Sequence, residues 1–283
     1  MSERRRYPIG AEPTSDGVHF RVWAPDRREV AIVVDGQPAQ RLKAEGNGYF
    51  SGLQAGIAQG ARYRIQLDQG EAFPDPASRF QPDGPHGPSQ VVDPHQFAWT
   101  DSAWPGHGLL GLVIYELHIG TFTPEGTWAA ATHELQELAG IGINCVEVMP
   151  VADFAGEFGW GYDGVNLFAP TRLYGTPDEF RTFVDTAHSL GISVLLDVVY
   201  NHLGPDGNYL DQFAKSYFTD RYTTDWGAAL NFDGPECTPV REYFLTNAAY
   251  WIDEYHLDGL RLDATQNIYD DAPPASHILT HIG

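Results

Sequence analysis

The sequence predicts an antiparallel β-sandwich followed by a parallel α/β sheet. Apolar and polar residues alternate with a period of two over residues 17–67, whereas continuous apolar runs alternate with helical stretches after Gly111. Between them, residues 71–108 are rich in Pro, Gly, His and Asp and show no periodicity, which is typical of a boundary segment. We therefore expect a sandwich domain with its linker over residues 1–105 and an α/β part over residues 106–283.

Short alternating runs predict the strands of the sandwich. In the runs 18–22, 30–34 and 63–67, every second residue is apolar, so each run has one face that can be buried. Glycine-containing breaks at residues 35–36 and 46–48 separate the runs and are typical turn signals. Strands of this kind form antiparallel sandwiches.

The second part of the chain contains longer apolar runs, which predict buried strands with helices between them. Such strands form parallel sheets, because helices cover both faces. The predicted strands lie in LVIYELHIG (112–120), INCVEVMP (143–150), ISVLLDVVY (192–200) and LDGLRLDA (257–264). The predicted helices lie near 130–139, 177–190 and 240–255, and the last of these is expected to bury Phe244, Ala248, Trp251, Ile252 and Tyr255.

Composition narrows the classes of partner. Lys and Arg total 17 and Asp and Glu total 38, so the formal net charge is −21 and nucleic acid is not expected as a partner. No phosphate-binding glycine motif occurs, and no run reaches the about 18 apolar residues of a membrane helix. The basic start lacks an apolar segment, so we expect no signal peptide and a cytoplasmic protein. Cys145 and Cys237 lack the spacing of a zinc site or disulfide framework, and we expect no metal or cofactor.

Polar residues gather where the predicted parallel strands end, which is where α/β folds place their functional side chains. The candidates are His118 and Glu147 at the first two strands, Trp160, Tyr162 and Asp163 in the loop FGWGYDGVN, Asp197, Asn201 and His202 at the third strand, and Arg261 and Asp263 at the fourth.

Asp263 is the strongest candidate for chemistry. Arg261 and Asp263 point to the same face of a strand, whereas Leu260 and Leu262 point to the other. A guanidinium beside a carboxylate favours its ionised form, and an ionised carboxylate can attack an anomeric carbon. The alternative is a structural Arg–Asp pair at a strand end, and the motif alone does not separate the two.

The other candidates suit an uncharged carbohydrate. His202 can donate a hydrogen bond to a sugar hydroxyl, Asp197 can orient Arg261, and Trp160 and Tyr162 can stack on sugar rings. The alternatives are a polar cluster that caps the sheet and ordinary aromatic packing.

Several motifs resemble the α-amylase superfamily of glycoside hydrolases. DVVYNH (197–202) and GLRLDA (259–264) are similar to two of its signature regions. The longer runs 75–94, 115–128, 158–180, 226–235 and 257–274 resemble the members of that superfamily that release trehalose from maltooligosyl trehalose. The resemblance extends over essentially the whole chain.

The resemblance implies a carbohydrate-module-like sandwich joined to a (β/α)₈ barrel, and a retaining cleavage of the α-1,4 bond beside the terminal trehalose unit. It implies Asp263 as the nucleophile and Arg261 as its partner, with Tyr162, Asp197 and His202 lining the sugar subsite. Asn201 matches a position that binds calcium in some amylases, but the resemblance does not extend to the metal.

The predicted strands amount to half of such a barrel, which takes about 250 residues. In the superfamily, the general acid/base glutamate follows the fifth strand and a stabilising aspartate follows the seventh, and neither has a counterpart here. Glu116 and Glu147, on earlier strands, are weak substitutes. We therefore expect a truncated enzyme that hydrolyses little alone. The alternatives are a glycogen-branching or debranching relative and a non-catalytic α-glucan-binding fragment; oligomeric state stays open.

Overall fold

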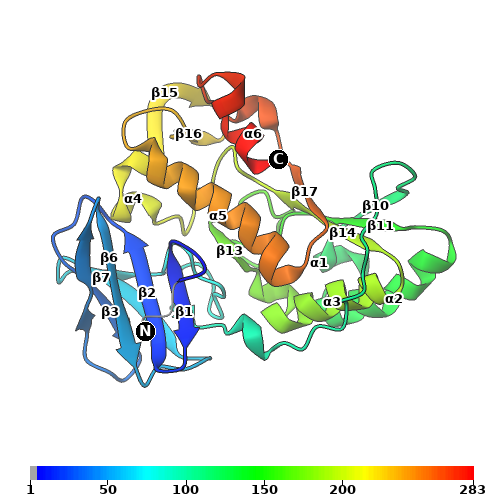
Figure 1. Ribbon diagram of the computed structural model, residues 1–283, viewed down its shortest axis with the longest axis horizontal. Coiled ribbons are helices and arrows are strands. Elements are labelled where there is room, and N and C mark those ends of the chain that lie inside the picture. The colour runs from blue at the N-terminus through cyan, green and yellow to red at the C-terminus, as the bar shows by residue number, and fades with distance from the viewer. Residues whose placement is uncertain (1–4) are drawn as a thin grey trace.

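The computed structural model describes residues 5–283 as a β-sandwich, a long connecting segment and a parallel sheet with its helices (Figure 1). Residues 1–4, which begin the basic start of the chain, lie outside the described residues. Among residues 5–283, no helix has the length and apolar character needed to cross a membrane.

The sandwich consists of two antiparallel sheets. One has the strand order β1-β2-β6-β5, and the other has the order β4-β3-β7-β8, with β9 also paired to β7. The predicted alternation is confirmed, because Val18, Phe20 and Val22 are buried on one face of β2. Strand β1 precedes the predicted start of the pattern at residue 17 and pairs with β2. The strands are β1 (Gly10–Thr14), β2 (Gly17–Trp23), β3 (Val30–Val34), β4 (Gln40–Arg41), β5 (Lys43–Gly46), β6 (Tyr49–Ala55) and β7 (Arg62–Leu67).

The connecting segment is ordered by buried polar contacts. It contains only the short strands β8 (Ala72–Phe73) and β9 (Ser89–Gln90) and one turn of 3₁₀ helix, η1 (Pro94–Gln96). The buried carboxylate of Asp75 accepts a hydrogen bond from Tyr63 Oη at 2.8 Å. Ser89 Oγ donates to Gln81 Oε1 at 2.8 Å. Side-chain hydrogen bonds and isolated buried apolar residues such as Phe73 and Val91 hold this segment. Because these residues do not recur at a strand or helix spacing, the segment shows no periodicity.

The second part is a four-stranded sheet in the order β10-β11-β14-β17, and every neighbouring pair is parallel. Each predicted strand and helix is present, so the first half of an α-amylase-type barrel is confirmed. The strands are β10 (Ile114–Leu117), β11 (Cys145–Val148), β14 (Ser193–Val198) and β17 (Gly259–Leu262). The main helices are α2 (Trp128–Gly140), α3 (Pro177–Ser189) and α5 (Cys237–Tyr255).

A local signal explains where α3 begins. Thr176 and Glu179 form a capping box at the start of α3, directly before Pro177. Trp128 of α2 stacks on Phe180 of α3 with ring centroids 4.0 Å apart, which packs the two helices together. The expected apolar stripe of α5 is wrong at Ile252, which is 39% exposed.

Several further short elements lie in the connections of the parallel sheet and after β17. The antiparallel pair β12 (Ala152–Asp153) and β13 (Asn166–Pro170) follows β11, and the hairpin β15 (Phe218–Thr224) and β16 (Gly227–Leu230) follows β14. The short helices are α1 (Ile119–Phe122), η2 (Arg172–Tyr174), α4 (Leu210–Phe213), η3 (Lys215–Tyr217), η4 (Thr265–Asn267), η5 (Pro274–Ser276) and α6 (Ile278–Ile282). Their brevity leaves no recognisable periodicity.

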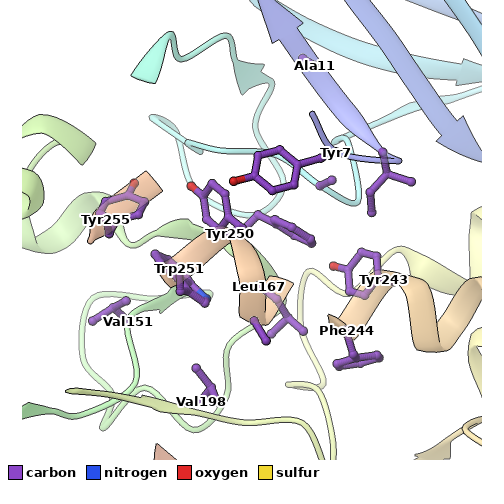
Figure 2. Packing of buried hydrophobic residues seen from close by; sticks show 14 of the residues in the cluster. Tyr7, Ala11, Val151, Leu167, Val198, Tyr243, Phe244, Tyr250, Trp251 and Tyr255 are labelled. Carbon is purple, nitrogen blue, oxygen red and sulfur yellow. The ribbon is translucent and has the colours of Figure 1, made fainter. Parts of the chain in front are cut away.

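Helix α5 joins the sandwich to the sheet. Its aromatic residues Tyr243, Tyr250 and Trp251 are buried in one hydrophobic cluster with Tyr7 (Figure 2). Tyr243 Oη donates to the carbonyl oxygen of Pro76 at 2.8 Å, which also ties the connecting segment to the helix. The sandwich and the parallel sheet therefore share one core.

Candidate active site

A chain of hydrogen bonds links four of the candidate residues at the carboxyl ends of β14 and β17. Arg261 Nη1 donates to Asp263 Oδ1 at 2.7 Å and to Asp197 Oδ2 at 2.8 Å. Tyr162 Oη donates to the same Asp197 oxygen at 2.9 Å. Asp197 and Arg261 lie directly opposite each other in the parallel register of the two strands, so the backbone pairing itself brings them together.

Asp263 continues the edge of the sheet one residue beyond β17. Its backbone N–H donates to the carbonyl oxygen of Val198 at 3.0 Å, and the next residue, Ala264, has a left-handed φ of 40°. The side chain of Asp263 is 20% exposed and that of Arg261 is 42% exposed. The carboxylate is thus fixed by backbone pairing and by Arg261, and it remains accessible to a ligand.

Asp197 lies behind this pair. Its side chain is 1% exposed, and its Oδ2 atom accepts from both Arg261 and Tyr162. Burial raises the pKa of Asp197 to about 6, although the hydrogen bonds from Arg261 and Tyr162 lower it. Burial and the bond to Asp197 also raise the pKa of the Tyr162 phenol. In these contacts Asp197 orients Arg261, as the sequence predicted.

His202 is held by the backbone of the loop that carries Tyr162. His202 Nε2 donates to the carbonyl oxygen of Tyr162 at 2.9 Å, and its buried Nδ1 atom has no hydrogen-bond partner among the described residues. Burial lowers the pKa of His202, which favours the neutral ring. The ring of Trp226, 48% exposed, stacks on His202 with centroids 5.5 Å apart. Trp226 is not among the predicted site residues, and its only signal in the sequence is its place in the run 226–235.

The loop between β12 and β13 presents the remaining aromatic candidate to solvent. Trp160 is 75% exposed, and Asp163 is also exposed. Gly161 has φ +94°, and a Cβ atom there would lie 2.0 Å from the carbonyl oxygen of Pro150. Only glycine fits that position, so the loop conformation between Trp160 and Tyr162 depends on Gly161.

His118 anchors the same loop from the end of β10. Its Nε2 atom lies 2.9 Å from the carbonyl oxygen of Gly159 and 3.0 Å from Tyr174 Oη. These contacts place His118 against the backbone beside Trp160. The described hydrogen bonds do not connect it to the Asp263 chain, so it acts here as a support for the loop.

Glu116 and Glu147 lie opposite each other in the register of β10 and β11. Glu147 is also in register with Leu195, two residues before Asp197 along β14, so the glutamates lie one layer below the Asp263 site. Burial, together with the neighbouring charge of Glu116, raises the pKa of Glu147.

Among residues 5–283, no three His, Cys, Asp or Glu side chains are grouped as metal ligands. Asn201 is buried, and its side-chain amide has no hydrogen-bond partner among the described residues.

This arrangement can supply an accessible, oriented carboxylate beside a guanidinium and two aromatic surfaces. A carboxylate so placed can bind a sugar through its hydroxyls or attack its anomeric carbon. The chemistry-bearing residues come from the strand ends and the loops after them, as in other parallel α/β folds.

Comparisons with known proteins identify relatives of this chain over nearly its whole length. The family described as alpha amylase, catalytic domain, matches residues 90–237, about half of the chain. Malto-oligosyltrehalose trehalohydrolase from Deinococcus radiodurans is 46% identical over 98% of this chain, and that from Saccharolobus solfataricus is 44% identical over 97%. A crystal structure from Salmonella typhimurium, of a protein designated an alpha amylase, superposes with a TM-score of 0.92 at 45% identity over 98% of this chain.

The chain spans about half the length of these relatives: 45% of the Deinococcus protein, 48% of the Saccharolobus protein and 46% of the Salmonella chain. The match of the family model over residues 90–237 shows the family. The chain belongs to the α-amylase catalytic-domain family.

Proposed function

We propose that these residues form the nucleophile half of a retaining glycoside hydrolase that acts on α-glucans. Its substrate is a maltooligosyl trehalose, and it releases trehalose by cleaving the adjoining α-1,4 bond, a step in trehalose formation. The observation that carries the proposal is the accessible Asp263 carboxylate held by Arg261 at a strand end. The names of the 46% and 44% identical relatives support the choice of substrate.

In the proposed mechanism, a carboxylate oxygen of Asp263 bonds to the glucosyl C1 atom while the bond from C1 to the leaving oxygen breaks. The leaving oxygen takes a proton from a carboxylic acid, and trehalose departs. Water then attacks C1, gives its proton to the same acid/base group and frees Asp263. Arg261 donates a hydrogen bond to Asp263 and keeps its carboxylate oriented for the attack.

The acid must lie about 5–5.5 Å from the nucleophile in a retaining enzyme. Asp197 shares the Arg261 donor with Asp263, but it is 1% exposed and faces Arg261 and Tyr162. A leaving group therefore has no path to Asp197. We propose that the acid comes from the part of the relatives that this chain does not span.

The test compares two proteins: the 283-residue chain and a completed chain, in which it is joined to the part of the Deinococcus relative that it does not match. We expect trehalose from maltooligosyl trehalose with the completed chain and little or none with the 283-residue chain. Trehalose release by the 283-residue chain at an ordinary enzymatic rate would overturn the assignment of the acid. New α-1,6 branches in place of trehalose would overturn the hydrolase and indicate a branching enzyme.

A further inference from the structure

A second cluster of titratable residues lies at the opposite end of the parallel sheet from Asp263. His188, at the end of α3, is 1% exposed and lies between two carboxylates. Its Nδ1 atom is 2.9 Å from Asp101 Oδ2, in the connecting segment, and its Nε2 atom is 3.0 Å from Asp258 Oδ2, directly before β17. The ring thus bridges a helix, the connecting segment and the start of the strand that carries Asp263.

The geometry requires a charged ring. A neutral imidazole has one N–H, whereas here both ring nitrogens face carboxylate oxygens, which only accept hydrogen bonds when ionised. Both bonds are therefore made only by the imidazolium. Asp101 and Asp258 are 6% and 13% exposed, so loss of that charge would leave two nearly buried carboxylates facing an uncharged ring.

Aromatic residues of the connecting segment cover the cluster. Trp104 stacks on His188 with centroids 4.8 Å apart and an interplanar angle of 10°, and its Nε1 atom donates to Asp258 Oδ1 at 2.7 Å. Trp99 stacks on His256, whose Nδ1 atom lies 2.8 Å from Asp101 Oδ2. An indole face attracts a cation, so the charge on His188 favours the Trp104 contact as well.

We propose that His188, as an imidazolium between Asp101 and Asp258, is a pH-sensitive latch that holds residues 97–108 against the base of the parallel sheet. Protonation closes the latch, and deprotonation releases this part of the connecting segment without unfolding the sandwich or the sheet. The latch is independent of the proposed hydrolase reaction.

Several titratable groups surround His188, and the two carboxylates that it contacts shift its pKa upward. Asp101 and Asp258 face His188 directly, and His256 contacts Asp101. Farther out, Asp185 accepts a hydrogen bond from Thr100, His107 contacts Ser193, and Cys145 lies near Asp258. Burial lowers the pKa of His188, but the hydrogen bonds to the two carboxylates outweigh it and raise the pKa above the ordinary value. Its contribution to stability is therefore complete below about pH 6.5 and is lost as the pH rises through the raised pKa.

The carboxylates of Asp101 and Asp258 set the lower pH limit of the closed latch. Burial raises the pKa values of Asp101 and Asp258, but hydrogen bonds outweigh it and lower both values. The bonds to Asp101 come from His256 and His188, and those to Asp258 come from His188 and Trp104. The contribution of these carboxylates is present above about pH 4 and is lost as the pH falls through the lowered values. The latch is thus closed from about pH 4 up to the raised pKa of His188. Above that pKa it opens, because His188 loses its proton.

The experiment uses the 283-residue chain. Nitrogen-15 NMR follows the His188 ring, identified by the signal missing from His188→Gln, and hydrogen exchange follows the Trp104 amide, which donates to the carbonyl oxygen of Asp101 at 2.7 Å. We expect both ring nitrogens to be protonated at pH 6, and the exchange rate of Trp104, corrected for intrinsic base catalysis, to rise about tenfold or more as His188 deprotonates. His133→Gln, on the exposed face of α2, serves as the control and leaves both curves unchanged.

Asp101→Asn keeps the test valid where His188→Gln does not fold. It removes one carboxylate, so we expect the pKa of His188 to fall by about one unit and Trp104 to open at a correspondingly lower pH. A neutral His188 ring at pH 6 in the unmodified chain would overturn the proposal. Protection of Trp104 that does not change through the His188 titration would overturn it equally.

Discussion

Arg261 and Asp263, two residues apart at the end of β17, are joined by a hydrogen bond of 2.7 Å from Nη1 to Oδ1. The same Nη1 atom donates a hydrogen bond to Asp197 on the neighbouring strand. One guanidinium therefore binds both the accessible carboxylate of Asp263 and the buried carboxylate of Asp197. This sharing makes the orientation of Asp263 depend on the pairing of β14 with β17.

Replacement of Asp263 by Asn should abolish turnover. An amide cannot form the glycosyl ester, so we expect trehalose release by the completed chain to fall by about 10⁴-fold or more. Initial rates on maltooligosyl trehalose measure the effect, with Asp211→Asn, an exposed position on α4, as the control. Turnover of Asp263→Asn equal to that of the control would refute the nucleophile assignment.

The buried carboxyl of Asp197 should give the chain a specific pH dependence. Its folded pKa, about 6, is above the unfolded value, so its favourable contribution is complete below about pH 4 and is lost as the pH rises through 6. Relative to the unmodified chain, Asp197→Asn should therefore gain about 2–3 kcal/mol in free energy of unfolding between pH 4 and pH 7.

Urea unfolding at the two pH values measures that gain. Asp153→Asn is the companion variant, because burial also raises the pKa of Asp153 to about 6 and the change should have the same sign. A difference between Asp197→Asn and the unmodified chain that is independent of pH would show that Asp197 titrates alike in both states.

Two glycines of one loop allow a matched test of its backbone. Gly156 and Gly161 have φ values of +89° and +94°, but a Cβ atom at Gly156 meets nothing within 4 Å, whereas one at Gly161 lies 2.0 Å from the Pro150 carbonyl oxygen. We expect Gly156→Ala to cost about 1–2 kcal/mol of unfolding free energy. Gly161→Ala should cost about 2 kcal/mol more, because the clash adds to the strain. Equal costs in chemical denaturation would contradict the close approach.

Trp160 should contribute to ligand binding and not to folding. Because its side chain is 75% exposed, Trp160→Ala should change the unfolding free energy by less than about 0.5 kcal/mol. Loss of one stacking surface should weaken maltoheptaose binding about fivefold in calorimetric titrations. Phe158→Ala removes a 93% exposed ring from the same loop and shows whether the effect is specific to Trp160. Unchanged affinity in Trp160→Ala would remove this residue from the proposed sugar site.

The amino-acid sequence determined the four strands of the parallel sheet and the buried face of the main sandwich strands. The spacing of two between Arg261 and Asp263 already placed both side chains on one side of β17, because successive residues of a strand point to opposite faces. Continuous apolar runs between helices likewise specified a parallel sheet, since such runs are typical of strands that helices cover on both faces. Strands β11 and β14 are buried in this way, whereas Ile114 and Tyr115 of β10 are 45% and 38% exposed. The hairpin β15–β16 escaped prediction because β15 is mostly polar and has no buried residue, so it shows no alternation of apolar and polar side chains.

Tertiary structure alone decided which distant residues meet. The register of β14 with β17 brought Asp197 to Arg261, and the packing of the connecting segment brought Asp101 to His188, 87 residues away. It also turned His118 toward the loop backbone at Gly159. Local periodicity specifies the face that a residue occupies within its own element, whereas register and the packing between elements decide which residue faces it from elsewhere in the chain.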